Sequence, residues 1–182
     1  MSRAFAALLR AQRVGKPRAF ASTARGRPPR WKSYHLTASG AGCQTTSLTD
    51  DGYRIVSDTP TAAGGRGSAP QPVQLLLGAL MGCEQATAHF LATKLRCPPI
   101  REIRFDIQAV RDEWGSLAPP VTAPPPTLSR LQRISGTATV FTDASAAEVA
   151  AIAAGVKERC PVASMIIESG CELDVKWVKA EE

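Results

Sequence analysis

The first 49 residues of the chain contain no aspartate or glutamate, and Asp50 is the first acid. Residues 1–31 carry seven arginines and Lys16, so about −2 of the net charge of +6 is left for the rest of the chain. A near-neutral body offers no basic patch for phosphates. We therefore expect no nucleic-acid partner.

The leader, residues 1–30, is rich in Arg, Ala and Ser, a composition typical of a mitochondrial transit peptide. Its apolar run, AFAALL, is too short for a secretory signal. The stretch RAFAS at 18–22 is similar to a mitochondrial processing pattern and predicts cleavage after Phe20. A disordered basic tail is the alternative. We expect a nuclear-encoded eukaryotic protein of the mitochondrial matrix, where thiols stay reduced.

Paired cysteine motifs are also missing. The five cysteines are odd in number and widely spaced, and none form a CxxC pair: Cys43, Cys83, Cys97, Cys160 and Cys171. This argues against a disulfide framework and a zinc site, and we expect no metal or cofactor. Every apolar segment of about 18 residues has polar interruptions, so we expect no transmembrane span.

The first half of the remaining chain combines short strands with one long helix. Residues 31–38, 42–49 and 53–57 are predicted strands, with Asp51–Gly52 as a hairpin turn. A loop rich in Gly and Pro follows, in which Ser68 is expected to cap the next helix.

That helix is predicted over Pro72–Leu95 and is apolar or small in almost every direction. Gly78, Gly82 and Ala86 form a stripe of small residues that favours the close approach of another helix. A partner subunit would complete the burial of the helix. The alternative is a monomer whose sheet wraps around it.

The second half alternates between strands and helices. Residues 101–114 and 130–142 are predicted antiparallel strands, joined by a mobile surface insertion at 115–129 that contains five prolines. A helix follows with Ser145 and Glu148 at capping-box spacing, and Pro161 ends it. A short second helix and a strand at 171–178 complete an α+β fold with antiparallel sheets.

Two cysteines are candidates for chemistry. A cysteine in mid-helix, such as Cys83, is usually an inert small hydrophobe. Cys160 lies where a helix begins at Pro161, so the helix dipole favours a thiolate there, with Lys157 and Arg159 nearby. A packing role at the helix junction is the alternative for Cys160.

The stretches SDTPTAAGGRGSAPQPVQLLLGALMGC and VKERCPVASMI together resemble the OsmC/Ohr family, the osmotically induced and organic-hydroperoxide-resistance proteins. The shared features are a D-x-P…GG loop, a proline-led apolar helix with a cysteine, and a late CP motif. The resemblance implies an OsmC-like fold over residues 31–180. In such a fold, sheets wrap around a long central helix in an intertwined homodimer, with the active site at its interface.

The resemblance also implies a thiol peroxidase that acts in oxidative stress defence. Cys83 would attack an organic hydroperoxide or hydrogen peroxide, and Cys160 would resolve the resulting sulfenic acid as a disulfide. A thiol reductant, such as a lipoylated protein, would reopen that disulfide.

The sequence departs from the family's peroxidase members at two positions. Val73, next to Gln74, stands where they have a glutamate, and Gly42–Cys43 lies near the place of an activating arginine. Arg66, in the glycine loop, is the candidate substitute, and a solvated loop charge is the alternative. Glu84 lies about 100° around the helix from Cys83 and is expected to face elsewhere.

These departures keep a second function open, a non-peroxidase homodimer that senses redox state or binds an apolar ligand. Cys43 is a candidate third thiol. Cys97 and Cys171 are interpreted as packing residues, and His89 as a histidine of the interface.

Overall fold

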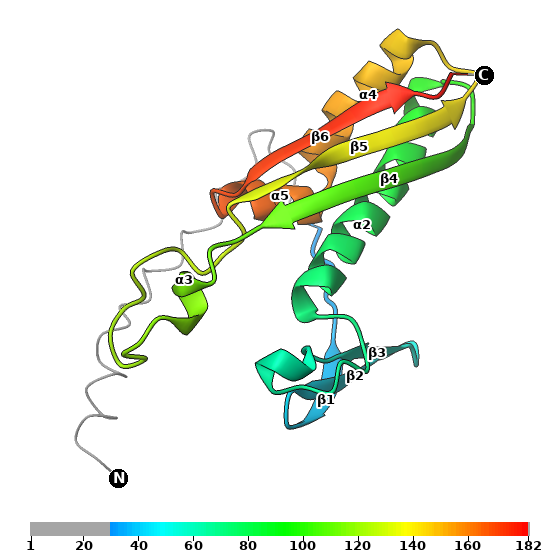
Figure 1. Cartoon of the computed structure of the whole chain (residues 1–182). Coiled ribbons are helices and arrows are strands. Elements are labelled where there is room, and N and C mark those ends of the chain that lie inside the picture. Colours follow the sequence, from blue (N-terminus) through cyan, green and yellow to red (C-terminus); the bar gives the residue numbers. More distant parts are fainter. Residues whose placement is uncertain (1–29, 182) are drawn as a thin grey trace.

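The computed structural model describes residues 30–181. The predicted transit peptide, with its cleavage site after Phe20, lies outside the described residues except for Arg30. Three strands lead into a long helix, and a second three-stranded sheet is completed by two further helices (Figure 1).

The N-terminal sheet is an antiparallel meander of β1 (Leu36–Ala41), β2 (Gln44–Thr49) and β3 (Arg54–Ser57). The three predicted strands are confirmed, but β1 begins later than expected. Gly42 starts a turn rather than a strand, because its φ of 61° lies in the left-handed region.

The loop after β3 is organised by Asp58, whose side chain is fully buried. Ser68 donates to Asp58 Oδ2 from its backbone N–H at 3.1 Å and from its hydroxyl at 2.8 Å. The prediction that Ser68 caps the long helix is therefore wrong, because its hydroxyl is committed to Asp58. Gln71 is the N-cap, and its backbone N–H donates to the Gln74 side chain at 2.8 Å.

The long helix α2 (Pro72–Leu95) has the bounds predicted from the sequence, with proline in its first turn. One of its faces is buried in the core and carries Leu80, Ala88 and Leu91. The predicted stripe of small residues is on the surface of the single chain. In the described part of the chain, no atom outside the helix would lie within 4 Å of a Cβ added at Gly78 or Gly82.

The second sheet has the order β4 (Ile100–Val110), β5 (Arg133–Thr142), β6 (Glu172–Lys179). The antiparallel pairing of β4 with β5 is confirmed. The β5–β6 pair is parallel, so the prediction of antiparallel strands throughout is wrong for this pair. The helical connection between the two strands carries the chain back along the sheet, so β6 runs in the same direction as β5.

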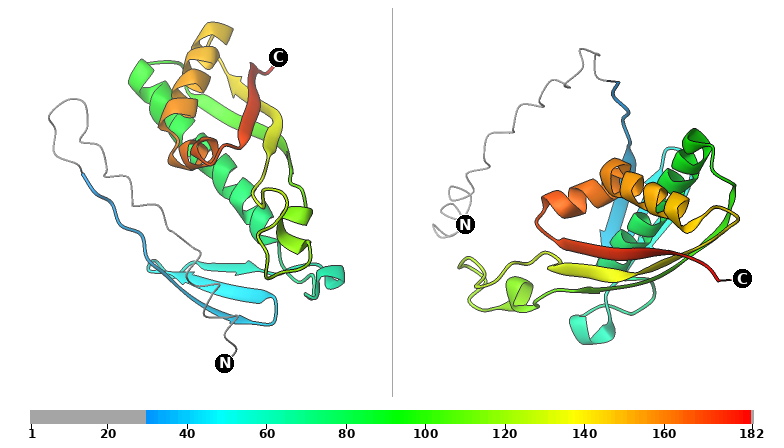
Figure 2. Two further views of the ribbon diagram at one scale, coloured as in Figure 1. Left: turned by 90° about the vertical axis from the view of Figure 1, so that its left-hand side faces the viewer. Right: turned by 90° about the horizontal axis from the view of Figure 1, so that it is seen from above.

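This crossover consists of α4 (Ala146–Arg159) and α5 (Pro161–Glu168). The predicted capping box is present, since Ser145 Oγ accepts from the Glu148 N–H and Glu148 Oε2 accepts from the Ser145 N–H. The helices cover one face of the sheet (Figure 2, right). The core between these layers includes Leu80, Ile134, Val140, Val149, Ile152 and Val156.

Two smaller elements complete the chain. The 3₁₀ turn η1 (Thr61–Ala63) lies in the glycine loop. The helix α3 (Trp114–Leu117) begins the predicted insertion, and the Ser129 hydroxyl donates to the Gly115 carbonyl, which ties the two ends of the insertion together.

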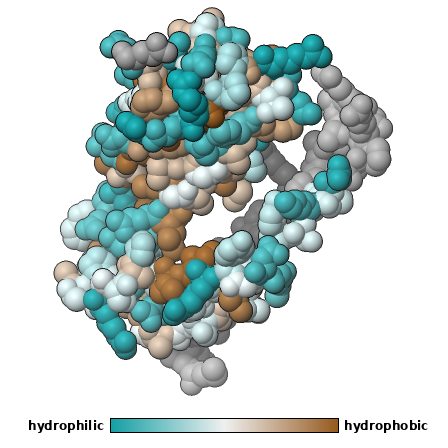
Figure 3. All heavy atoms as spheres, turned by 90° about the vertical axis from the view of Figure 1, so that its right-hand side faces the viewer, coloured by the Kyte–Doolittle hydropathy of each residue, from teal (hydrophilic) through white to brown (hydrophobic). Residues whose placement is uncertain are grey.

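The N-terminal sheet stands away from the rest of the chain (Figure 2, left). A wide groove with apolar walls separates it from the start of α2, and Ile55, Leu75 and Leu76 line the groove (Figure 3). Leu36, Leu48 and Ile55 on this sheet are exposed. A sheet of three short strands with apolar residues on its surface needs a further packing partner.

Among residues 30–181, α2 is the one helix whose length and composition would allow it to cross a membrane. The core helix of a soluble protein meets the same criterion, so this property is weak evidence for a span. The helix already forms the centre of a core with α4, α5 and the second sheet.

Candidate functional site

Cys83 lies in the middle of α2 and is half-buried. The Thr87 hydroxyl donates to the Cys83 carbonyl at 2.8 Å, one turn further along the helix. Glu84, the next residue, is 3% exposed and faces a different side of the helix, as its position on the helical wheel predicts. Its carboxylate lines a cavity between α4 and β6 rather than approaching the thiol.

Cys160 is both the C-cap of α4 and the N-cap of α5, which confirms its predicted position at a helix start. Its side chain is fully buried. The Ala163 N–H donates to the Cys160 Sγ at 3.4 Å, the interaction that an N-cap side chain makes with the third residue of its helix.

The structure brings the two cysteines together. Cys83 lies near enough to Cys160 to raise the pKa of its thiol by hydrogen bonding and charge, and both thiols are free. Packing of α5 against α2 places them near each other, because α2 presents Cys83 in its middle while Pro161 starts α5 beside it.

Burial raises the pKa of the Cys160 thiol to about 11, and the hydrogen bond and charge of Cys83 add to the effect. The Ala163 N–H lowers the pKa but does not compensate. The prediction that the helix start favours a thiolate at Cys160 is therefore wrong, because loss of solvent outweighs the helix terminus. Cys160 is held as a protonated thiol at neutral pH.

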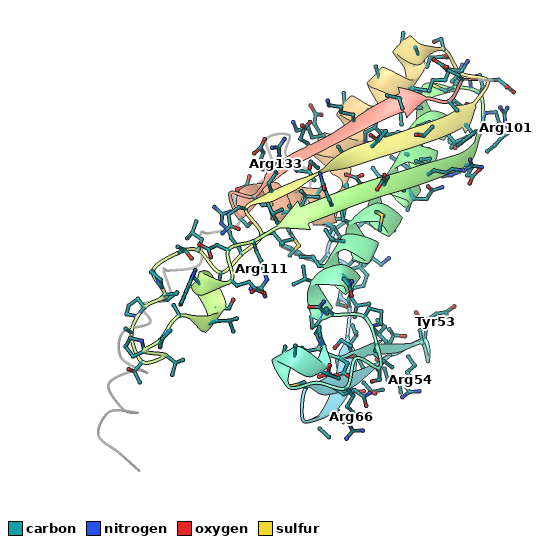
Figure 4. The ribbon with its side chains drawn as sticks, in the orientation of Figure 1. Tyr53, Arg54, Arg66, Arg101, Arg111 and Arg133 are labelled. Carbon is teal, nitrogen blue, oxygen red and sulfur yellow. The ribbon has the colours of Figure 1, made fainter. Side chains whose placement is uncertain are left out.

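Arg66 is not brought to the thiols within one chain. Its backbone N–H donates to Asp58 Oδ2 at 3.2 Å, while its side chain is exposed. It lies at the N-terminal sheet, beyond the start of α2 (Figure 4). Val73, at the position of the family's glutamate, is half-buried in the first turn of α2.

An apolar pocket of about 460 Å³ opens between α2, α5 and the ends of the insertion. Ala79, one turn before Cys83, and Val162, two residues after Cys160, are among its walls, so the pocket comes close to both cysteines although neither of them lines it. Arg111 and Arg130 also line it. Sequence reasoning did not single out these two arginines as site residues. The one weak signal for them is that they flank the proline-rich insertion on its two sides.

The remaining cysteines lie elsewhere. Cys43 is exposed in the β1–β2 turn, and Cys97 is half-buried against the core. Cys171 is buried and also lines the apolar pocket. Burial raises the pKa of Cys171, and the charge of Arg130 opposes that shift. His89 is exposed, with Nε2 2.8 Å from the Gln85 amide nitrogen.

Several solved structures share this fold. An OsmC-like protein from Mycoplasma pneumoniae superposes with a TM-score of 0.67 at 22% identity, over 82% of this chain and 99% of that protein. An organic hydroperoxide resistance protein OsmC from Legionella pneumophila gives 0.61 at 19% identity, over 84% and 100%. The organic hydroperoxide resistance protein OhrB of Bacillus subtilis gives 0.53 at 20% identity, over 82% and 98%.

A comparison with curated proteins gave no match. The family model for OsmC-like protein matches residues 65–176, more than half of the chain, and both Cys83 and Cys160 fall inside this range. The matched range also includes α2 and the CP motif at the start of α5. The chain belongs to the OsmC-like protein family.

Proposed function

We propose that this protein is a homodimeric thiol peroxidase that reduces organic hydroperoxides or hydrogen peroxide in defence against oxidative stress. The observation that carries the proposal is the proximity of the thiols of Cys83 and Cys160, which come from two different helices. Two proteins of the same fold, from Legionella pneumophila and Bacillus subtilis, are named for organic hydroperoxide resistance.

Cys83 is the attacking sulfur in this proposal. Its thiolate forms a bond to the terminal peroxide oxygen, the O–O bond breaks, and the leaving alkoxide takes up a proton to become an alcohol. Cys83 is then a sulfenic acid. In the second step the sulfur of Cys160 attacks the sulfenic sulfur, its proton leaves with the hydroxyl group as water, and a disulfide forms. The raised pKa of Cys160 leaves little thiolate at neutral pH, so this step requires Cys160 to lose its proton as it attacks.

The apolar pocket beside the thiols supports an organic substrate. Its volume of about 460 Å³ and its apolar walls suit the hydrocarbon part of a hydroperoxide. Arg111 and Arg130 are the arginines of this pocket, and we propose them as candidates for stabilising negative charge near the reaction. Arg66 could stabilise this charge only in a dimer in which it approaches the thiols of the partner subunit.

Three surface features support the homodimer. The N-terminal sheet has little packing within its own chain, as the groove beside it shows. The small residues Gly78, Gly82 and Ala86 form an open stripe along α2, and Leu76 and Phe90 are exposed on the same helix. Two copies that pack along α2 would bury this surface, as obligate dimers do.

We also propose a mitochondrial matrix location, on the composition of residues 1–30. A reductant must return the disulfide to two thiols. A dithiol carried on a protein, such as a lipoylated protein of the matrix, fits this need by its chemistry.

Thiol counting tests the peroxidase directly. The reduced protein is mixed with one equivalent of cumene hydroperoxide, and free thiols are titrated over minutes. We expect the loss of two thiols per chain, abolished in Cys83→Ser and retained in the matched control Cys43→Ser. Unchanged thiols in the unaltered protein would contradict the proposal.

One observation favours the alternative, a redox-sensing or apolar-ligand-binding homodimer. Val73 replaces the glutamate of the peroxidase members, and within residues 30–181 of one chain no arginine donates a hydrogen bond to Cys83. A disulfide that forms with an oxidised dithiol but not with a hydroperoxide would identify the sensor.

A further inference from the structure

A second cavity is lined by neither of the two thiols. It has a volume of about 310 Å³ and opens between α4 and β6. Ala150, Ala153 and Ala154 form its wall on α4, so the short side chains of the alanine-rich run leave space beside the sheet. Trp177 lines the cavity from β6, and Glu84 lines it from α2.

Glu84 is the unexplained group of this cavity. It is 3% exposed, and its Oε2 is buried with no hydrogen-bond partner among residues 30–181. Burial raises the pKa of Glu84 to about 7, so a large fraction is charged at physiological pH. A buried acceptor without a partner costs about 1–3 kcal/mol, so a residue kept there needs a compensating contact.

We propose that the cavity between α4 and β6 binds a small organic cation, a primary ammonium or a guanidinium, whose N–H groups donate to Glu84. A carboxylate only accepts hydrogen bonds, so its ligand must be a donor, and a positive charge gains most from a partly desolvated site. The proposal is independent of the peroxidase chemistry, because neither Cys83 nor Cys160 lines this cavity.

The other walls fit the same class of ligand. Trp177 supplies an aromatic ring, a surface that attracts organic cations. Asp174 adds a second carboxylate at the rim, where it lies 3.7 Å from Arg133. The alanine wall leaves room for a short alkyl chain. The charge of Glu84 disfavours an anion. The cavity volume of about 310 Å³ excludes a large ligand.

Lys157 is the one cation among the lining residues, and it makes no ion pair with Glu84. Its side chain is exposed, so its ammonium group stays with solvent. The charge of Lys157 opposes any cationic ligand, and the two carboxylates of the lining, Glu84 and Asp174, outnumber it.

The test uses n-butylammonium chloride as the probe and the full-length protein, labelled with ¹⁵N. The indole N–H signal of Trp177, assigned by its loss in Trp177→Phe, is followed during the titration. We expect a saturable shift with a Kd on the order of 1 mM. Butanol and butyrate, of matched size but neutral and anionic, should give no saturable shift.

Two variants assign the site. Glu84→Gln has nearly the same shape and should weaken binding by at least about tenfold, since it removes the charge from the hydrogen bonds. Glu158→Gln, an exposed residue of α4 outside the cavity, is the matched control and should bind as the unaltered protein does. Ala153→Leu fills the cavity and should abolish binding even with Glu84 intact.

The proposal is overturned if n-butylammonium gives no saturable shift. It is equally overturned if Glu84→Gln binds the probe as tightly as the unaltered protein, or if butanol binds as tightly as n-butylammonium. The spectra themselves report whether each variant is folded.

Discussion

Cys83, in the middle of α2, lies near enough to Cys160, the N-cap of α5, to raise the pKa of the Cys160 thiol. The two residues come from distant parts of the sequence and meet only because α5 packs on α2. Their environments differ: Cys160 is fully buried and Cys83 is half-buried. A peroxide in solvent can therefore reach the sulfur of Cys83 more easily than that of Cys160.

The separate roles of the two sulfurs can be trapped chemically. In Cys160→Ser, Cys83 has no thiol to condense with, so we expect its sulfenic acid to accumulate and to react with dimedone after hydroperoxide is added. The steady-state peroxidase rate should fall at least about tenfold. Mass spectrometry of the adduct is the measurement, with Cys43→Ser as the control, which should form no such adduct. An adduct on Cys160 in Cys83→Ser would reverse the assignment.

The pKa of Cys160 depends in part on its neighbour. Burial contributes most to the value of about 11, and the Cys83 hydrogen bond and charge contribute further. Cys83→Ala should therefore lower the pKa of Cys160. The measurement is a pH titration of thiolate absorbance in Cys83→Ala, with the Cys83→Ala/Cys160→Ser double variant as the background to subtract. An unchanged pKa would mean that burial alone accounts for the shift.

Glu84 makes the stability of the fold depend on pH. Its pKa rises from 4.5 to about 7 on folding, so the folded state is favoured below the lower value and loses stability as the pH rises through 7. Relative to the unaltered protein, Glu84→Gln should gain roughly 2–3 kcal/mol between pH 4.5 and pH 8. Urea unfolding at fixed protein concentration measures this gain. The exposed residue variant Glu158→Gln should show no such trend, and a gain independent of pH would contradict the burial of a charge.

The glycine loop before α2 has one position that excludes any side chain. A Cβ at Gly65 would lie 2.0 Å from the Thr59 carbonyl oxygen, a backbone atom that cannot move freely. Gly65→Ala should cost about 2–3 kcal/mol of stability. Gly67, with a φ of +64° and open space around it, is the matched control, and Gly67→Ala should cost about 1 kcal/mol. Equal melting temperatures for the two variants would contradict the steric explanation.

Local signals in the sequence were enough to predict much of this architecture. Proline at residue 72, the spacing of Ser145 and Glu148, and proline at residue 161 define helix ends, because capping depends on near neighbours. The family motifs, rather than local chemistry, paired Cys83 with Cys160.

What the sequence could not supply depends on distant contacts. Ser68 has the chemistry of a helix cap, but a buried aspartate ten residues earlier holds its hydroxyl. The parallel β5–β6 pair follows from the path of the crossover. The burial of Glu84 depends on how α4 packs over α2. The pattern of side chains along one helix or strand does not show which distant residues it will contact.

A substitution in the stripe of small residues on α2 tests whether the protein is a dimer that packs along this helix. Within residues 30–181, a Cβ at Gly82 would have no side-chain or distant backbone atom within 4 Å, so the isolated chain should tolerate Gly82→Leu. A second copy packed along α2 would meet the new side chain and be pushed away, because closely packed helices have no room for it. In light scattering the unaltered protein should have about twice the mass of one 19.3 kDa chain, and Gly82→Leu should shift toward one chain. Ala151→Leu adds the same apolar group to an exposed position of α4 and should leave the mass unchanged. If Gly82→Leu kept the full dimer mass, the partner could not lie along this stripe, and the apolar surface beside the N-terminal sheet would be the remaining place for it.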